Sequence, residues 1–144
     1  MKTTEEYKEA LMKKYRFIKE VKLSSFDVPY IGYNHVVKSR EAFDTITRRE
    51  AKIVFKKDIK VIENFLNRNL TREIPQRHFD IMVSLCYDIG TKAFKNSLFF
   101  NLYLLGEIKE AFKHYLVWGK IKGEYSQSLT NRRKDELNYI FHTV

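Results

Sequence analysis

The chain has 144 residues, a length typical of one domain, and 44% of them are hydrophobic, which excludes intrinsic disorder. Its net charge is +9, and 15% of its residues are aromatic against only five glycines and two prolines, which favours a helix-rich fold over an all-β one. The charge fits either a solvated surface or a polyanionic partner: nucleic acid, a membrane surface or the anionic bacterial wall.

Several classes of site and segment are not indicated. Cys86 is the only cysteine, so no internal disulfide forms, and we expect it to be a buried apolar residue. No run of 18 apolar residues and no secretory signal is present, so we expect no membrane span, and cytoplasmic synthesis. The four histidines lack zinc-like spacing, so we expect neither a metal site nor a cofactor.

The predicted elements begin with a helix that starts at a capping box, Thr3-x-x-Glu6, and continues to about Val21. Ser24–Asp27 is predicted to form a turn. The only extended segment follows, from Val28 to His35, where Pro29 fixes φ and Gly32 permits a positive φ.

The rest of the chain is predicted to be helical. A second capping box, Thr47-x-x-Glu50, opens a strongly amphipathic helix, and Pro75 opens another that ends near Gly90. The segment 93–105 is apolar nearly all round, so we expect it to be the most buried helix. A helix over 108–118, a loop over 119–128 and a last helix capped by Thr130 or Asn131 complete the prediction.

Five ordered motifs resemble those of the phage-type lysozymes, the glycoside hydrolase family 24 endolysins. The segment V-P-x-I-G-Y-x-H at 28–35 is similar to their T-I-G-Y-G-H. The other four lie in order along the chain: the helix from I-T-x-x-x-A to D-I at 46–59, Q-x-x-F-D-x-x-V-S at 76–84, D-I-G-x-x-A-F-x-x-S-L at 88–98, and W at 118 with L-x-N-R-R-x-x-E at 129–136.

The resemblance implies an α+β, mostly helical, lysozyme-like fold in a single domain over 1–144. It implies a small β-hairpin lobe near 22–36 and a larger helical lobe over 46–144. The implied activity is that of a peptidoglycan muramidase cleaving the β-1,4 bond between N-acetylmuramic acid and N-acetylglucosamine, acting as a monomer at the cell wall after release. Its partner would be peptidoglycan or another anionic wall glycan, and nucleic acid is not the expected partner.

Glycoside hydrolysis needs two carboxyl groups, one to protonate the leaving oxygen and one to activate water or attack. In the family the acid is a Glu at the end of the first helix, in I-K-x-F-E-G, and the second carboxylate is an Asp of the hairpin. Aligned on Ile18–Leu23, the Glu position carries Lys22, and the Thr position before I-G-Y-G-H carries Tyr30.

Glu20 and Asp27 are therefore the candidate acid and base. The alternatives are a solvated carboxylate at a helix end for Glu20 and a turn-forming Asp27. Tyr30, Tyr33, Asn34 and His35 are candidate substrate-binding or hairpin residues, with His35 expected to be a hydrogen-bonded structural residue. Arg132 and Arg133 fit either an ion pair with Glu136 or a substrate contact. The departures from the family pattern leave a second function open, a lysozyme-fold protein that binds wall glycan or a partner without cleaving it.

Overall fold

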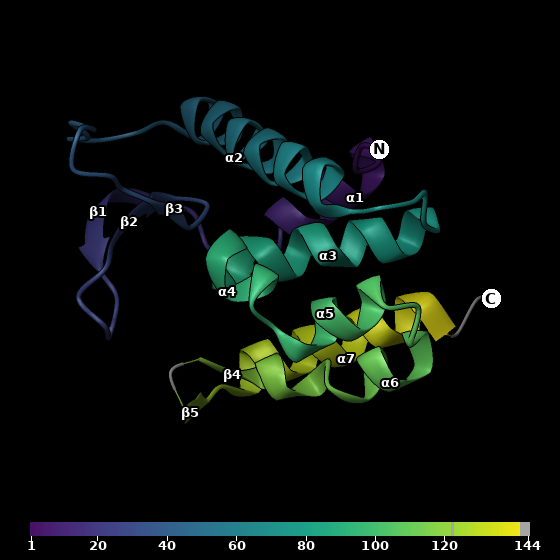
Figure 1. Cartoon of the computed structure of the whole chain (residues 1–144). Coiled ribbons are helices and arrows are strands. Elements are labelled where there is room, and N and C mark those ends of the chain that lie inside the picture. Colours follow the sequence, from purple (N-terminus) through teal and green to yellow (C-terminus); the bar gives the residue numbers. More distant parts are fainter. Residues whose placement is uncertain (122, 142–144) are drawn as a thin grey trace. The chain divides into compact units, whose positions relative to one another are not determined.

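A computed structural model of the chain describes residues 1–121 and 123–141. It divides into two compact units, one formed by Lys2–Asn64 and the other by Phe65–Val144 together with Met1. Helix α2 (Arg48–Asn69) crosses the boundary between them. The predicted class is confirmed, because helices dominate the chain and the first unit carries a small three-stranded antiparallel sheet (Figure 1).

The first unit begins with α1 (Glu5–Met12), which is capped by Thr4 rather than Thr3. The Thr4 side chain accepts a hydrogen bond from the backbone N–H of Tyr7. The backbone N–H of Thr3 instead donates to the buried Glu63 carboxylate at 2.6 Å. The predicted capping box at Thr3 was therefore wrong: the cap is the Thr4 hydroxyl alone, and the N–H of Thr3 is satisfied by Glu63 of α2.

The first helix ends nine residues earlier than the sequence predicts. Residues Ile18–Leu23 form strand β1, which pairs antiparallel with β2 (Pro29–Gly32), and β2 pairs with β3 (His35–Val36). The prediction of helix up to Val21 was wrong, because this segment pairs with β2, with Ile18 opposite Gly32 and Lys22 opposite Tyr30, and that pairing overrides the helical spacing.

Two residues with positive φ shape the turns of this sheet: Asp27, with φ 60°, between β1 and β2, and Asn34, with φ 65°, between β2 and β3. Asp and Asn tolerate this conformation better than most residues. Gly32, with φ 67°, lies so close to α2 that an added Cβ would be 3.2 Å from the Cβ of Ala51.

The second unit is built on α3 (Gln76–Ile89), whose residues from Phe79 to Cys86 are all buried. The unit's other elements are α4 (Thr91–Lys95), α5 (Leu98–Leu104), α6 (Ile108–Lys113), the 3-10 helix Leu116–Gly119, strands β4 (Lys120–Ile121) and β5 (Glu124–Tyr125), and α7 (Gln127–Phe141). Helices α4 and α7 pack on α3, and α5 packs on α6. Among the described residues no helix is both long and apolar enough to cross a bilayer.

Several predicted boundaries in this unit were wrong. The segment 93–105 is two short helices separated at Ser97, whose hydroxyl caps α5. Leu98 and Leu105 of this segment are 54% and 76% exposed, so α3 and not this segment is the most buried helix. The expected loop over 119–128 contains β4 and β5, apart from residue 122, which lies outside the described residues. The last helix starts at Gln127, because the Ser126 hydroxyl accepts from the N–H of Leu129.

Candidate active site and hairpin pocket

The three-stranded sheet of the first unit carries both candidate catalytic carboxylates. Glu20 lies within β1 and is exposed, and its backbone forms an isolated bridge with Thr45. Asp27 is exposed in the turn between β1 and β2. Glu20 is therefore neither a helix-end carboxylate nor buried, and burial is what keeps a general acid protonated in enzymes of this class.

Glu20 and Asp27 are separated along the hairpin by the second half of β1 and by the start of the turn, in which the N–H of Asp27 donates to the carbonyl of Ser24. Carboxyl groups that cleave a glycosidic bond lie about 5–5.5 Å apart in retaining enzymes and about 6.5–9.5 Å apart in inverting ones.

A pocket of about 220 Å³ lies at the base of the hairpin, and neither Glu20 nor Asp27 lines it. Its walls are formed by Tyr15, Arg16, Ile18, Lys22, Tyr30 and Asn34. Lys22 and Tyr30 are direct partners across β1 and β2, which explains why they meet there. The pocket is thus lined by two cations and two phenol rings, and by no carboxylate.

The end of α1 differs from what the family resemblance implies. The helix ends at Met12 with Lys13 as its C-cap, and the seven residues 13–19 contain four basic residues and no carboxylate. Lys22, which the alignment put at the Glu position, lies in β1 and not at the end of a helix. The last carboxylate of α1 is Glu9, whose pKa is lowered chiefly by its hydrogen bond from Lys52, at 2.7 Å.

His35 is held between two carboxylates. Its Nδ1 lies 2.6 Å from Asp58 Oδ2, and its Nε2 lies 3.0 Å from both oxygens of Glu41. Burial lowers the pKa of His35, but the hydrogen bonds and charges of Asp58 and Glu41 outweigh it and raise that pKa. Burial raises the pKa of Asp58. These contacts join β3 to α2 and the connection between them, so His35 has the structural role expected of it.

The other hairpin candidates divide between pocket and core. Tyr30 and Asn34 line the pocket. Tyr33 is 9% exposed and packs its ring 5.6 Å from that of Phe17, so it belongs to the core of the first unit. Tyr15 and Arg16 were not among the candidates, and the signal that indicates them is the run of alternating basic and aromatic residues from Lys14 to Phe17.

In the second unit, Arg132 and Arg133 form ion pairs rather than facing solvent. Arg132 lies 2.6 Å and Arg133 2.7 Å from the two oxygens of Asp88. Arg133 is fully buried and also lies 2.6 Å from Glu136, which accepts a hydrogen bond from the Tyr115 hydroxyl at 2.7 Å. Burial raises the pKa of Glu136, while Arg133 opposes that rise. These residues tie α7 to α3, so the structural role is the one observed for Arg133.

Neither a metal cluster nor a reactive thiol is found in the part of the chain that the structure describes. No group of three or more His, Cys, Asp or Glu side chains there could hold a metal ion. Cys86 is buried in α3, as expected, and burial raises the pKa of its thiol.

Comparison with known proteins decides the family. Residues 15–136 match the sequence profile described as Phage lysozyme. This chain belongs to the phage lysozyme family. The match starts after α1 and covers the hairpin, α2 and most of the second unit, so the likeness is not confined to one motif.

Individual relatives are similar at low identity. The endolysin of Bacillus phage PZA is 29% identical over 106 residues, which are 74% of this chain and 41% of that endolysin. An endolysin from Escherichia coli O157:H7 phage FAHEc1 has a TM-score of 0.80 at 23% identity, covering 100% of this chain and 96% of its own. The muramidase domain of SpmX from Asticaccaulis excentricus has a TM-score of 0.81 at 23% identity, covering 99% of both chains.

These likenesses differ in what they support. At 23% identity the two solved structures support the lysozyme fold alone. The chain spans about two-fifths of the length of the endolysins of Bacillus phages PZA and B103, so it matches only part of those proteins.

Proposed function

We propose that this lysozyme-family chain binds the glycan strands of peptidoglycan and hydrolyses them weakly or not at all. The observation that carries the second half of the proposal is the end of α1. Lys13 is the C-cap there, and no carboxylate occurs between that residue and Glu20 in β1. The family resemblance implies a general acid at the end of the first helix. The ammonium group of a lysine is a much weaker acid than a carboxyl group, so a lysine there does not replace it as the donor of a proton to the leaving oxygen.

Family membership and charge support the first half of the proposal. Endolysin and muramidase are the names carried by the relatives, and both imply a wall polymer as the partner. The net charge of +9 favours association with an anionic polymer.

The direct test of binding is co-sedimentation with purified, protein-free cell walls. The full chain should be recovered mainly in the wall pellet, and the turbidity of the wall suspension should stay at that of a buffer control. A chain that remains in the supernatant at low salt would contradict the proposal.

Hydrolysis by Glu20 and Asp27 is the second candidate. It is supported by the family match and by the fact that these two are the only carboxylates between residues 10 and 40. In this case Glu20 would protonate the leaving oxygen and Asp27 would position water for attack on the β-1,4 bond between N-acetylmuramic acid and N-acetylglucosamine.

A turbidity assay separates the two candidates. If Glu20 is the acid, Glu20→Gln removes the proton donor at nearly constant size and should slow wall clearing by about 10²-fold or more. Asp27→Asn tests the base in the same way. If the wild type clears walls and both variants clear them equally fast, neither Glu20 nor Asp27 takes part in the hydrolysis.

A further inference from the structure

The solvent-facing side of α2 carries a row of residues at helical spacing. Residues 48–64 of this helix belong to the first unit, and their buried apolar side chains recur along one side. The opposite side, which we call the basic face, consists of Arg49, Ile53, Lys56, Lys57, Lys60 and Val61, all of them exposed. Their spacing of i, i+4, i+7, i+8, i+11 and i+12 is the one that places residues on one side of a helix. The basic face is therefore a continuous surface along α2, the long blue-to-teal helix of Figure 1.

The basic face is distinguished by its separation of charge rather than by a lack of partners for its cations. The carboxylates of α2 are all engaged elsewhere: Glu50 accepts from the N–H of Thr47 in the first turn, Asp58 lies 2.6 Å from His35, and the buried Glu63 accepts from the N–H of Thr3. On α6, by contrast, the exposed Lys113 lies 3.2 Å from the exposed Glu110. The basic face is thus a surface of one sign, which fits a partner with a negatively charged surface.

Two large aliphatic side chains lie exposed among these cations. Ile53 is 51% and Val61 60% exposed, and Lys57 and Lys60 lie between them along the helix. A soluble polymer of phosphates, such as nucleic acid, is bound through cations and offers aliphatic side chains no apolar phase to enter. An anionic bilayer serves both kinds of side chain, because its headgroups attract Lys and Arg and its boundary with the acyl chains takes up aliphatic groups. The composition of the basic face therefore favours a lipid surface over a soluble polyanion.

We propose that the basic face of α2 binds the surface of an anionic lipid bilayer. Its cations contact the headgroup phosphates, and Ile53 and Val61 enter the boundary between the headgroups and the acyl chains. The helix lies parallel to the bilayer in this arrangement, since the face runs for about 18 Å along the helix axis from residue 49 to residue 61. The inference goes beyond the proposed wall binding and does not depend on it.

The test is flotation of the full chain with vesicles of phosphatidylcholine, prepared with and without phosphatidylglycerol as the anionic lipid. The chain should float with the anionic vesicles and stay at the bottom of the gradient with the neutral ones, because the headgroup charge attracts the basic face. Added salt should weaken the binding, because it screens that attraction. Flotation with neither kind of vesicle, or with both kinds equally, would overturn the inference.

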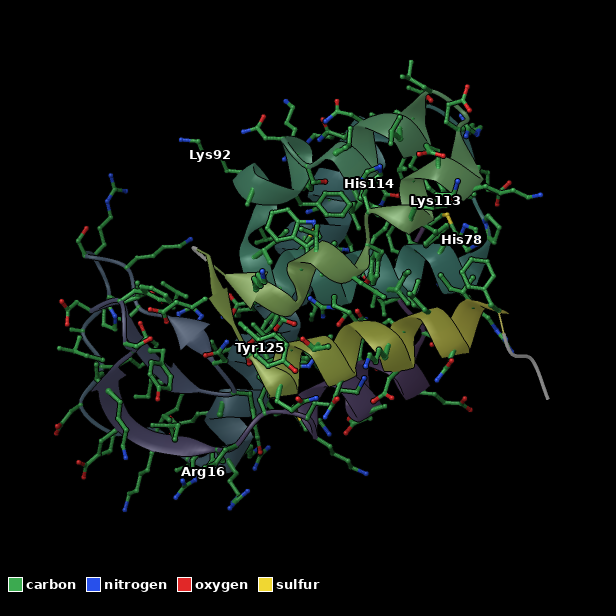
Figure 2. All side chains as sticks on the ribbon, turned by 90° about the horizontal axis from the view of Figure 1, so that it is seen from below. Arg16, His78, Lys92, Lys113, His114 and Tyr125 are labelled. Carbon is green, nitrogen blue, oxygen red and sulfur yellow. The ribbon has the colours of Figure 1, made fainter. Side chains whose placement is uncertain are left out.

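A matched pair of double variants separates the basic face from the net charge of the whole chain. Replacing Lys56 and Lys60 by Gln should weaken binding to the anionic vesicles by about 30-fold, since each lysine at an anionic surface contributes about fivefold. The control replaces Lys92 and Lys95, two exposed lysines of α4, by Gln, and Figure 2 shows the Lys92 side chain extending away from the ribbon. Both variants lose the same charge. Equal losses of binding would show that the net charge acts without a defined face, and would overturn the inference.

The aliphatic side chains distinguish a bilayer from a soluble polyanion. Ile53→Gln keeps the charge of the basic face, and it should weaken binding to the anionic vesicles by about fivefold, because about half of an isoleucine side chain no longer leaves water for the bilayer. The same variant should leave any binding to duplex DNA unchanged. Vesicle binding that Ile53→Gln does not weaken, or tighter binding of the wild type to duplex DNA than to anionic vesicles at equal salt, would assign the face to a soluble polyanion and overturn the inference.

Discussion

His35 lies with a carboxylate at each ring nitrogen, so its protonated form can donate two charge-assisted hydrogen bonds at once. Its burial and its structural role were predictable from its place in an extended segment next to Gly32. The partners were not, because Asp58 is 23 residues away and Glu41 sits in an irregular connection. At the scale of residues, the sequence indicates which positions have an unusual backbone conformation or side-chain environment, such as Asn34 with its positive φ. It does not indicate the partners that the fold brings to them.

The raised pKa of His35 predicts a pH dependence of stability. A histidine whose pKa is raised on folding adds stability that is complete below its unfolded pKa, about 6.5, and is lost as pH rises through the folded pKa. His35→Gln should therefore lower the free energy of unfolding by about 1.5–3 kcal/mol near pH 6 and by less at pH 9. Urea unfolding of both proteins at the two pH values measures this. A difference that grows toward pH 9 would contradict it.

Arg133 is the second residue whose burial predicts a large effect of substitution on stability. Its guanidinium is fully buried between Asp88 and Glu136. Removing one member of a buried ionic cluster leaves the others uncompensated, so Arg133→Met should cost about 3–5 kcal/mol. Arg40→Met, at an exposed position, is the control and should cost less than about 0.5 kcal/mol. Thermal or urea unfolding measures both, and a similar small cost at both sites would show that the cluster does not stabilise the fold.

At the scale of elements, long amphipathic helices were predictable and short partner-dependent elements were not. The capping box of α2 is observed as predicted: the Glu50 carboxylate accepts from the N–H of Thr47, and the Thr47 hydroxyl accepts from that of Glu50. Strand β1 was missed because its pairing with β2 depends on residues farther along the chain. The error mattered for function, because it placed the expected acid at the end of a helix that had already stopped at Met12.

Helix α5 offers a test of packing with a neighbouring control. Phe99 is fully buried and its ring lies 5.2 Å from that of Phe112 and 5.0 Å from that of Tyr115, whereas Leu98 is 54% exposed. Phe99→Ala should cost about 3–5 kcal/mol through lost contacts and a cavity. Leu98→Ala should cost less than about 1 kcal/mol. Denaturant midpoints of the two variants would be similar if α5 were not packed through Phe99.

At the scale of the whole molecule, the ordered motifs predicted the family, and the match over residues 15–136 confirms it. They did so because such motifs report residues that the fold needs, as the ion pairs of Arg132 and Arg133 show. Glycoside hydrolysis depends instead on two carboxyl groups. The hairpin region, where the resemblance places them, departs most from the family pattern, so the motifs predict the fold more directly than the chemistry.

The net charge predicts how wall binding responds to salt. A charge of +9 attracts an anionic wall across a screening length of about 8 Å at physiological ionic strength. Binding should therefore weaken between 50 mM and 500 mM NaCl in a sedimentation series. Duplex DNA is the control polymer. Tighter binding to DNA than to walls at equal salt would favour a nucleic-acid partner over the wall.

The most direct test of the account is the release of new reducing ends from purified peptidoglycan during a long incubation with the full chain. The account predicts that wild-type protein binds the walls but releases ends at no more than a trace rate, because no carboxylate lies at the end of α1. Robust release by the wild type, reduced about 10²-fold in Glu20→Gln, would contradict it and establish Glu20 as the general acid.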